Sequence, residues 1–212
     1  MTRVKICGLT DVAQARACVE LGADAIGLNF SRRSPRYVEP ERARAMVEAV
    51  DEVSGGRTVT VGVFVDAGGD EIAEIRERTG IRCVQLHGSE PPELVERFLP
   101  HAYKALRVRG EETIREARRY PGEHILLDAY VPGQQGGTGH SFEWGLATEL
   151  ARERHVTLAG GLNPHNVADA AAVVRPFCVD VASGVERAPG DKDLALVEAF
   201  IAGARGLQTP DP

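Results

Sequence analysis

The sequence predicts an α/β fold, a single-domain (β/α)8 TIM barrel, from three observations. Short apolar runs rich in β-branched residues recur eight times along the 212 residues. Segments whose apolar residues have helical spacing lie between these runs. Each run is apolar on both faces, as parallel strands covered by helices must be. Eight such strand–helix units are the number that closes a barrel.

The predicted strands are residues 4–7, 25–30, 59–65, 83–87, 104–108, 125–128, 156–159 and 178–182. A doubly wound open sheet is the structural alternative, because a local pattern does not distinguish a closed sheet from one with edges. No G-x-G-x-x-G motif follows the first strand. That absence, together with eight units, favours the barrel.

The predicted helices are residues 11–21, 41–50, 71–78, 92–98, 111–119, 143–152, 167–174 and 193–204. Gly22 is a typical C-terminal cap, and Pro40 a typical first-turn residue. Asn163 and Pro164 predict an N-cap and a first-turn proline for the seventh helix. No linker or break in composition divides the chain. We therefore expect one barrel domain over residues 1–205 and a frayed tail over 206–212.

The composition narrows the class of protein. Hydrophobic residues make up 43% and charged residues 26%, which excludes a disordered chain. The net charge of −6 argues against nucleic acid or an anionic membrane as a partner. We expect no secretory signal and no membrane span. Four scattered cysteines without a C-x-x-C pair predict reduced thiols in a cytoplasmic enzyme: Cys7, Cys18, Cys83 and Cys178.

Polar residues end several of the predicted strands, where the functional groups of a barrel lie. They are Cys7, Asn29, His87, Arg107, Asp128 and Asp180. Side-chain alternation places Cys7 on the same face as Lys5, and His87 on the same face as Gln85. Cys7 and Asp128 together suggest an acid/base pair across the barrel mouth. The alternative for Cys7 is a small packing residue, since free cysteine is often buried and inert.

Three glycine-rich segments follow the sixth, seventh and eighth strands. Glycine lets backbone N–H groups approach an anion closely, and barrels often bind phosphate after strands seven and eight. The candidate phosphate-binding residues are Gly137, Thr138, Gly139, Gly160, Gly161, Ser183 and Gly184.

The loop after the second strand carries Arg32, Arg33 and Arg36. A guanidinium group can hold a carboxylate through two parallel hydrogen bonds, so this loop is a candidate carboxylate clamp. The alternative is a solvated basic loop, because most exposed arginines have no further role.

The order of these motifs resembles phosphoribosylanthranilate isomerase, the barrel enzyme family of tryptophan biosynthesis. The resemblance runs from about residue 3 to 201. The segments that carry it are 4–10, 27–30, 34–37, 84–88, 127–128, 136–139, 159–162 and 180–186.

The resemblance implies an isomerase that performs an Amadori rearrangement of N-(5-phosphoribosyl)anthranilate. In the family the residue matching Asp128 is the general acid, and that matching Cys7 is the general base. Arg36 matches the residue that binds the anthranilate carboxylate, whereas His87 and Asp180 match polar residues of the pocket. The implied partner is a small phosphorylated substrate. No cofactor or metal is expected, and a monomer and a homodimer both remain open.

The sequence leaves alternatives for Lys5, for His140 and for the function. Lys5 can lower the pKa of the Cys7 thiol, which we expect to titrate below an ordinary cysteine, or it can pair with Asp180. His140 stands where many relatives carry lysine, which questions a side-chain contribution to phosphate binding. The alternative functions are the histidine-pathway aminoaldose isomerase, with an Asp expected in place of Cys7, and a non-catalytic phosphate-binding barrel.

Overall fold

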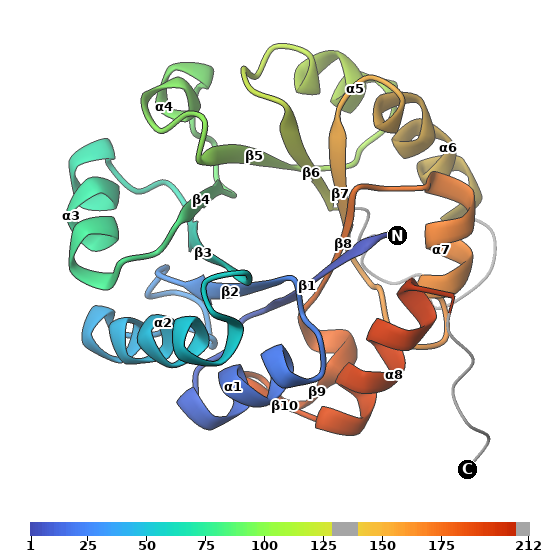
Figure 1. Cartoon of the computed structure of the whole chain (residues 1–212). Coiled ribbons are helices and arrows are strands. Elements are labelled where there is room, and N and C mark those ends of the chain that lie inside the picture. The colour runs from blue at the N-terminus through green and yellow to red at the C-terminus, as the bar shows by residue number, and fades with distance from the viewer. Residues whose placement is uncertain (129–139, 207–212) are drawn as a thin grey trace.

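A computed structural model of the chain shows a closed barrel of parallel strands inside a ring of helices (Figure 1). The structure describes residues 1–128 and 140–206, without the side chains of 140–143. The strands are β1 (Arg3–Cys7), β2 (Ala25–Asn29), β3 (Val59–Phe64), β4 (Cys83–Leu86), β5 (Ala102–Arg107), β6 (His124–Asp128), β7 (His155–Ala159) and β8 (Cys178–Val181).

Closure of the sheet is visible in the pairing of its first and last strands. Each strand pairs with the next one in the chain, and β8 pairs with β1. Lys5 lies opposite Asp180 in that final pairing. The barrel prediction is therefore confirmed, and the open doubly wound sheet is excluded.

The helices alternate with the strands and cover the outer face of the barrel. They are α1 (Val12–Glu20), α2 (Pro40–Ser54), α3 (Gly69–Thr79), α4 (Pro92–Arg97), α5 (Glu111–Ala117), α6 (His140–Ala151), α7 (Val167–Val174) and α8 (Leu194–Ala204). The side chain of Asp11 caps α1 by accepting a hydrogen bond from the N–H of Gln14. Pro40 opens α2 in its first turn, as predicted. Each predicted helix exists, with ends that differ by a few residues.

The start of α7 differs from the prediction. Asn163 and Pro164 do not cap and open this helix, which begins at Val167 after Asn166. Instead, Oδ1 of Asn163 accepts a hydrogen bond from the N–H of His165. Oδ1 of Asn166 accepts one from the N–H of Asn163. These local bonds hold a turn ahead of the helix, because asparagine side chains compete with helical hydrogen bonding.

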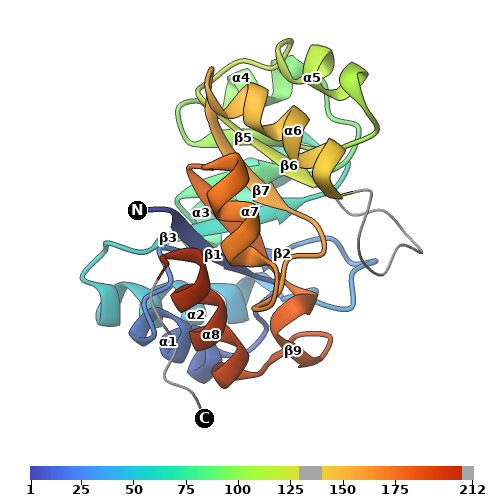
Figure 2. The ribbon, with the colours of Figure 1, turned by 90° about the vertical axis from the view of Figure 1, so that its right-hand side faces the viewer.

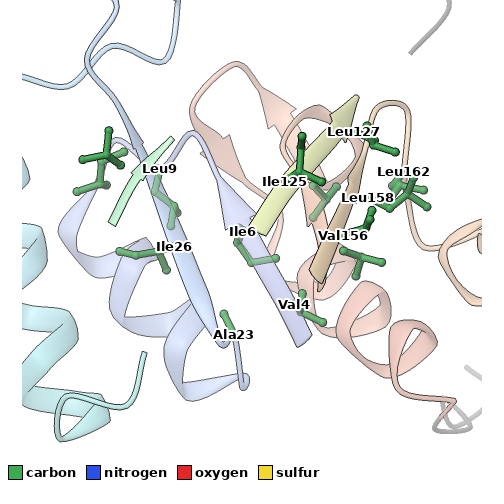
Figure 3. Close-up of a cluster of buried hydrophobic side chains, with 14 of the residues drawn as sticks. Val4, Ile6, Leu9, Ala23, Ile26, Ile125, Leu127, Val156, Leu158 and Leu162 are labelled. Carbon is green, nitrogen blue, oxygen red and sulfur yellow. The ribbon is translucent and has the colours of Figure 1, made fainter. Parts of the chain in front are cut away.

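The strands bury different side chains on their two faces. The outward face packs aliphatic residues against the helices, and Figure 3 shows part of this core around Val4, Ile6, Ile26, Ile125 and Leu158. The inward face holds a second, smaller cluster. Its members are Val61, Tyr103, Ala105, Leu126 and Ala159. Buried polar side chains share the barrel interior with this cluster.

A short antiparallel pair follows β8 and was not predicted. It consists of β9 (Glu186–Ala188) and β10 (Asp191–Lys192), after a 3-10 helix, η1 (Ser183–Val185). Figure 2 shows the chain's N-terminus and β9 on opposite sides of the barrel. This pair therefore lies at the carboxyl ends of the strands. Its strands contain only three and two residues, too few to give a recognisable pattern in the sequence.

The predicted tail, residues 206–212, lies outside the described residues apart from Gly206. Within the described parts of the chain, no helix is long and apolar enough to cross a membrane.

Candidate functional site

The polar strand ends do meet at one mouth of the barrel. Cys7 ends β1, Asp128 ends β6, and His87 directly follows β4. Nε2 of His87 lies 3.5 Å from Oδ2 of Asp128, and both side chains are about one-fifth exposed, at 24% and 21%. His87 and Asp128 thus face each other while keeping access to solvent.

Cys7 occupies a space that a neighbouring glycine provides. Gly27 on β2 pairs with Cys7 in the barrel sheet. A Cβ atom added at Gly27 would lie 2.6 Å from the Cys7 sulfur, a distance that real Cβ contacts do not show. The partly buried thiol is therefore accommodated only because residue 27 lacks a side chain.

A buried polar layer lies directly beneath these strand ends. Nζ of Lys5 donates hydrogen bonds to Oδ2 of Asp180 at 2.8 Å and to Oε1 of Gln85 at 3.0 Å. The hydroxyl of Tyr103 donates to the same Gln85 oxygen at 3.0 Å. Burial is the largest single influence and would lower the pKa of Lys5, but the charge and hydrogen bond of Asp180, together with the charges of Cys7 and Tyr103, outweigh burial and raise the pKa well above its ordinary value. Lys5 is therefore held as a cation inside the barrel.

Gln85 sets the orientation of His87. Because Oε1 of Gln85 accepts hydrogen bonds from Lys5 and Tyr103, its amide nitrogen faces Nδ1 of His87, at 3.3 Å. An amide NH₂ can only donate, so Nδ1 of His87 is the acceptor and Nε2 carries the proton. That N–H is aimed towards Asp128.

The expected low pKa of Cys7 is wrong for this structure. Burial is the largest influence and raises the pKa of the thiol, whereas the positive charge of Lys5 acts in the opposite direction. Lys5 therefore has both of the roles that the sequence offered as alternatives. It pairs with Asp180, and its charge still favours the Cys7 thiolate without overcoming burial.

Arg36 binds a carboxylate of the protein itself. Its Nε and Nη2 donate to the two carboxylate oxygens of Glu186 at 2.9 and 2.6 Å, a bidentate arrangement. Nζ of Lys192, fully buried, donates to the same carboxylate at 2.7 Å. Burial would raise the pKa of Glu186, but the hydrogen bonds from these two cations lower it. Arg36 remains 22% exposed.

The other two arginines of this loop point to solvent. Arg32 is 79% exposed and lies over the ring of Tyr37, and Arg33 is exposed as well. Of the three, only Arg36 reaches the partly buried network. The structure therefore separates one candidate clamp residue from two solvated ones.

The loops after β7 and β8 pack directly on each other. Gly160 and Gly161 have positive φ angles, 91° and 67°, which favour glycine. A Cβ atom added at Gly184 in η1 would collide with the carbonyl group of Leu162. The candidate residues Gly160, Gly161, Ser183 and Gly184 thus belong to adjoining loops. Gly137, Thr138 and Gly139 lie outside the described residues, as does the side chain of His140.

A cavity of about 440 Å³ opens beside His87. Its walls include Arg107 and Arg109 from the end of β5 and the loop after it, and Asp66 from the loop after β3. The polar strand end Arg107 therefore borders this cavity beside His87.

Sequence reasoning missed Gln85, Glu186 and Lys192 as parts of the site. Side-chain alternation placed Gln85 beneath His87, but it gave no sign of the hydrogen bond between them. Lys192 lies in a charged, glycine-containing stretch that resembles an exposed turn. Only the fold shows that this lysine is buried against Glu186.

Comparisons with known proteins identify the family of this chain. A sequence model of N-(5'-phosphoribosyl)anthranilate isomerase matches residues 4–203. The chain belongs to this family. Phosphoribosylanthranilate isomerases from Geobacter sp. strain M21 and Myxococcus xanthus are each 44% identical, covering 98% and 97% of this chain and 100% and 97% of their own lengths.

Solved phosphoribosylanthranilate isomerases share the whole fold. The crystal structure of the enzyme from Thermotoga maritima has a TM-score of 0.84 and 41% identity, covering 98% of this chain and all of its own. A second crystal structure is a complex of a phosphoribosylanthranilate isomerase with reduced 1-(o-carboxyphenylamino)-1-deoxyribulose 5-phosphate. It has a TM-score of 0.81 and 40% identity, with coverages of 98% and 100%.

Proposed function

We propose that this chain catalyses the Amadori rearrangement of N-(5-phosphoribosyl)anthranilate to 1-(2-carboxyphenylamino)-1-deoxyribulose 5-phosphate, a step of tryptophan biosynthesis in the cytoplasm. The observation that carries the proposal is the family match over residues 4–203. Cys7 ends β1 and Asp128 ends β6, which supports the proposal because the rearrangement needs a base and an acid at the same barrel mouth. The Cys7 position argues against the histidine-pathway alternative, for which an aspartate is expected there.

Asp128 is the proposed general acid. Its carboxyl group gives a proton to the furanose ring oxygen as the C1′–O4′ bond breaks, which leaves a Schiff base between C1′ and the anthranilate nitrogen. The N–H of His87, oriented by Gln85, faces Asp128 at 3.5 Å and has no hydrogen-bond partner among the described residues. His87 thereby also lies within the pocket, where it can contact the sugar.

Cys7 is the proposed general base. Its thiolate removes the C2′ proton of the Schiff base, and the electron pair moves to the nitrogen to form an enolamine. The enolamine then gains a proton at C1′ and loses one from the C2′ hydroxyl, giving the ketone. Asp128 donates one proton and Cys7 removes one before the ketone forms. Substrate and product therefore contain the same atoms, and the overall reaction is an isomerisation. Lys5 favours the thiolate by its charge.

Arg36 is the proposed partner of the substrate's anthranilate carboxylate. The cluster of Arg36, Lys192 and Glu186 contains two cations and one anion. One positive charge is therefore left uncompensated within the cluster. A carboxylate bound at the exposed part of the Arg36 guanidinium group would neutralise it, with Glu186 holding that group in position.

Asp180 and the glycine-rich loops supply the remaining proposed contacts. Oδ1 of Asp180 is buried without a hydrogen-bond partner among the described residues, so it is available to accept one from a sugar hydroxyl. Backbone N–H groups of Gly160, Gly161, Ser183 and Gly184 are proposed to bind the phosphate. The segment containing Gly137, Thr138 and Gly139 completes this proposed phosphate site.

Fluorescence tests the proposal directly. Turnover of phosphoribosylanthranilate quenches its emission, so purified protein should make the signal decay, whereas Cys7→Ser should leave it nearly steady. Cys83→Ser is the matched control, since that cysteine lies at the other end of the barrel, and it should behave as wild type. A steady signal with wild-type protein would indicate a non-catalytic barrel. Turnover of the histidine-pathway aminoaldose alone would favour that alternative. Size-exclusion chromatography separates a monomer from a homodimer.

A further inference from the structure

Three potential metal ligands meet at the end of the barrel opposite Cys7 and Asp128. His124 and His155 begin β6 and β7 and lie opposite each other in the register of those strands. Glu123 directly precedes His124. One donor atom from each of the three side chains lies within 4.8 Å of the others, and Oε2 of Glu123 is 4.0 Å from Nδ1 of His155. We propose that Glu123, His124 and His155 bind a divalent transition-metal ion of the zinc class.

The donor set suits such an ion. Imidazole nitrogen and carboxylate oxygen are both zinc ligands, and three protein ligands leave a fourth position for water. Zinc–nitrogen bonds of about 2.0–2.1 Å place tetrahedral donors roughly 3.3 Å apart. Oε2 of Glu123 and Nδ1 of His155 are 4.0 Å apart, and all three donors lie within 4.8 Å of one another. Rotation of the Glu123 side chain, which is 84% exposed, with small turns of the imidazole rings, can bring the donors closer without moving the strands.

Aromatic packing holds both imidazole rings in place. The ring of His155 stacks on Phe177 with a centroid distance of 4.3 Å, and the ring of His124 meets Phe177 edge-on at 5.1 Å. The two imidazole centroids are 4.9 Å apart. Phe177 therefore restricts both rings to small turns and keeps the two imidazoles side by side.

Solvent access favours the site, whereas nearby positive charges oppose it. Arg3 and Arg154 repel a cation, and the Glu123 carboxylate offsets part of that repulsion. His124 also lines a cavity of about 340 Å³, which gives an ion a path from solvent.

The position of the site predicts its effect. His124 starts β6 and Asp128 ends it, so the two residues are about 13 Å apart at roughly 3.3 Å per residue. An ion at this distance does not touch the proposed reaction. It links the first residues of two neighbouring strands, and binding to the folded chain alone stabilises that state.

Titration with zinc chloride tests the proposal. Calorimetry on wild-type protein should show one ion bound at these ligands, and zinc at about 100 times its Kd should raise Tm by roughly 5–10 °C. The double variant His124→Asn/His155→Asn should lose both effects. The variants His101→Asn and His165→Asn, which change exposed histidines outside the cluster, should keep both.

Two further measurements separate this site from zinc bound at the Cys7 thiol. The Cys7→Ser variant should retain the Tm shift. In nuclear magnetic resonance spectra, zinc should first move the ring signals of His124 and His155. Glu123→Gln should weaken binding about tenfold or more while leaving the metal-free Tm unchanged, because its side chain is exposed. Absence of binding to wild type, unchanged binding by the double variant, or a first response at His87 would overturn the proposal.

Discussion

Nζ of Lys5 lies 2.8 Å from Oδ2 of Asp180, and both side chains are buried inside the barrel. The two residues come from the first and the last strand, so this ion pair spans the seam where the sheet closes. It also lies beneath Cys7, whose thiol responds to the Lys5 charge. The pair thus connects closure of the fold with the electrostatics of the proposed base.

Removing one partner should destabilise the fold. Lys5→Met leaves the Asp180 carboxylate buried without its cation, which typically costs about 3–5 kcal/mol. We expect the free energy of unfolding, measured by urea titration, to fall by that amount. The double variant Lys5→Met/Asp180→Leu should recover much of the loss, because it removes the uncompensated charge. A fall of less than about 1 kcal/mol for Lys5→Met would show that the pair contributes little.

Asp128→Asn should slow the reaction without preventing substrate binding. The amide keeps the shape of the carboxyl group but cannot donate a carboxyl proton, and loss of a general acid typically costs about 10²- to 10⁴-fold in rate. Steady-state kinetics should therefore show a lower kcat with a KM close to wild type. A variant with wild-type kcat would remove Asp128 from the mechanism.

The reactivity of the Cys7 thiol should rise with pH. Burial raises the pKa of this thiol above its ordinary value, so the thiolate fraction grows as the pH increases from neutral. Deprotonation of the proposed acid Asp128 opposes this gain in turnover, so alkylation of the thiol is the direct measurement. Alkylation of Cys7 by iodoacetamide should accelerate by about tenfold per pH unit below the pKa, since the thiolate is the nucleophile.

Peptide mapping of the alkylated protein supplies the control for this pH dependence. Cys83 is the other partly exposed cysteine, and its modification should leave activity intact. Bound product should protect Cys7 and leave Cys83 unprotected. Full activity after complete modification of Cys7 would mean that another group is the base.

Arg36→Met should weaken binding of the anthranilate moiety. Hydrogen bonds to a charged group contribute about 1.5–3 kcal/mol, which corresponds to a loss of about 10- to 150-fold in product affinity. Arg33→Met is the matched control, because that arginine belongs to the same loop and is exposed. It should bind product as wild type does. Wild-type product affinity in Arg36→Met as well would mean that another residue binds the anthranilate carboxylate.

Local sequence patterns predicted the strands and helices well because each reflects burial of its own residues. Apolar runs identified the strands, and alternation correctly placed Lys5 beneath Cys7 and Gln85 beneath His87. Local patterns favoured a closed sheet but could not prove closure. The pairing of β1 with β8 joins residues 175 positions apart, such as Lys5 and Asp180, and only the structure shows it. The predicted N-cap of α7 was wrong because the asparagine turn that precedes this helix has a similar sequence pattern.

The candidate site was predictable only in part. The resemblance named the individual residues, but their partners depend on contacts across the fold. Glu186 lies 150 positions from Arg36, and nothing in the sequence near either residue indicates their ion pair. The predicted lowering of the Cys7 pKa was wrong. The sequence shows the nearby lysine, whereas only the structure shows that burial opposes the effect of its charge more strongly.

The close contact between Gly184 and the backbone of Leu162 has a consequence for engineering. Loops at the mouth of a barrel are often treated as independent modules that can be exchanged one at a time. Here the segment after β8 fits against the carbonyl of the segment after β7, with no room for even a methyl group. A graft that replaces one segment alone therefore brings a mismatched surface to the other. These two segments form one transplantable unit.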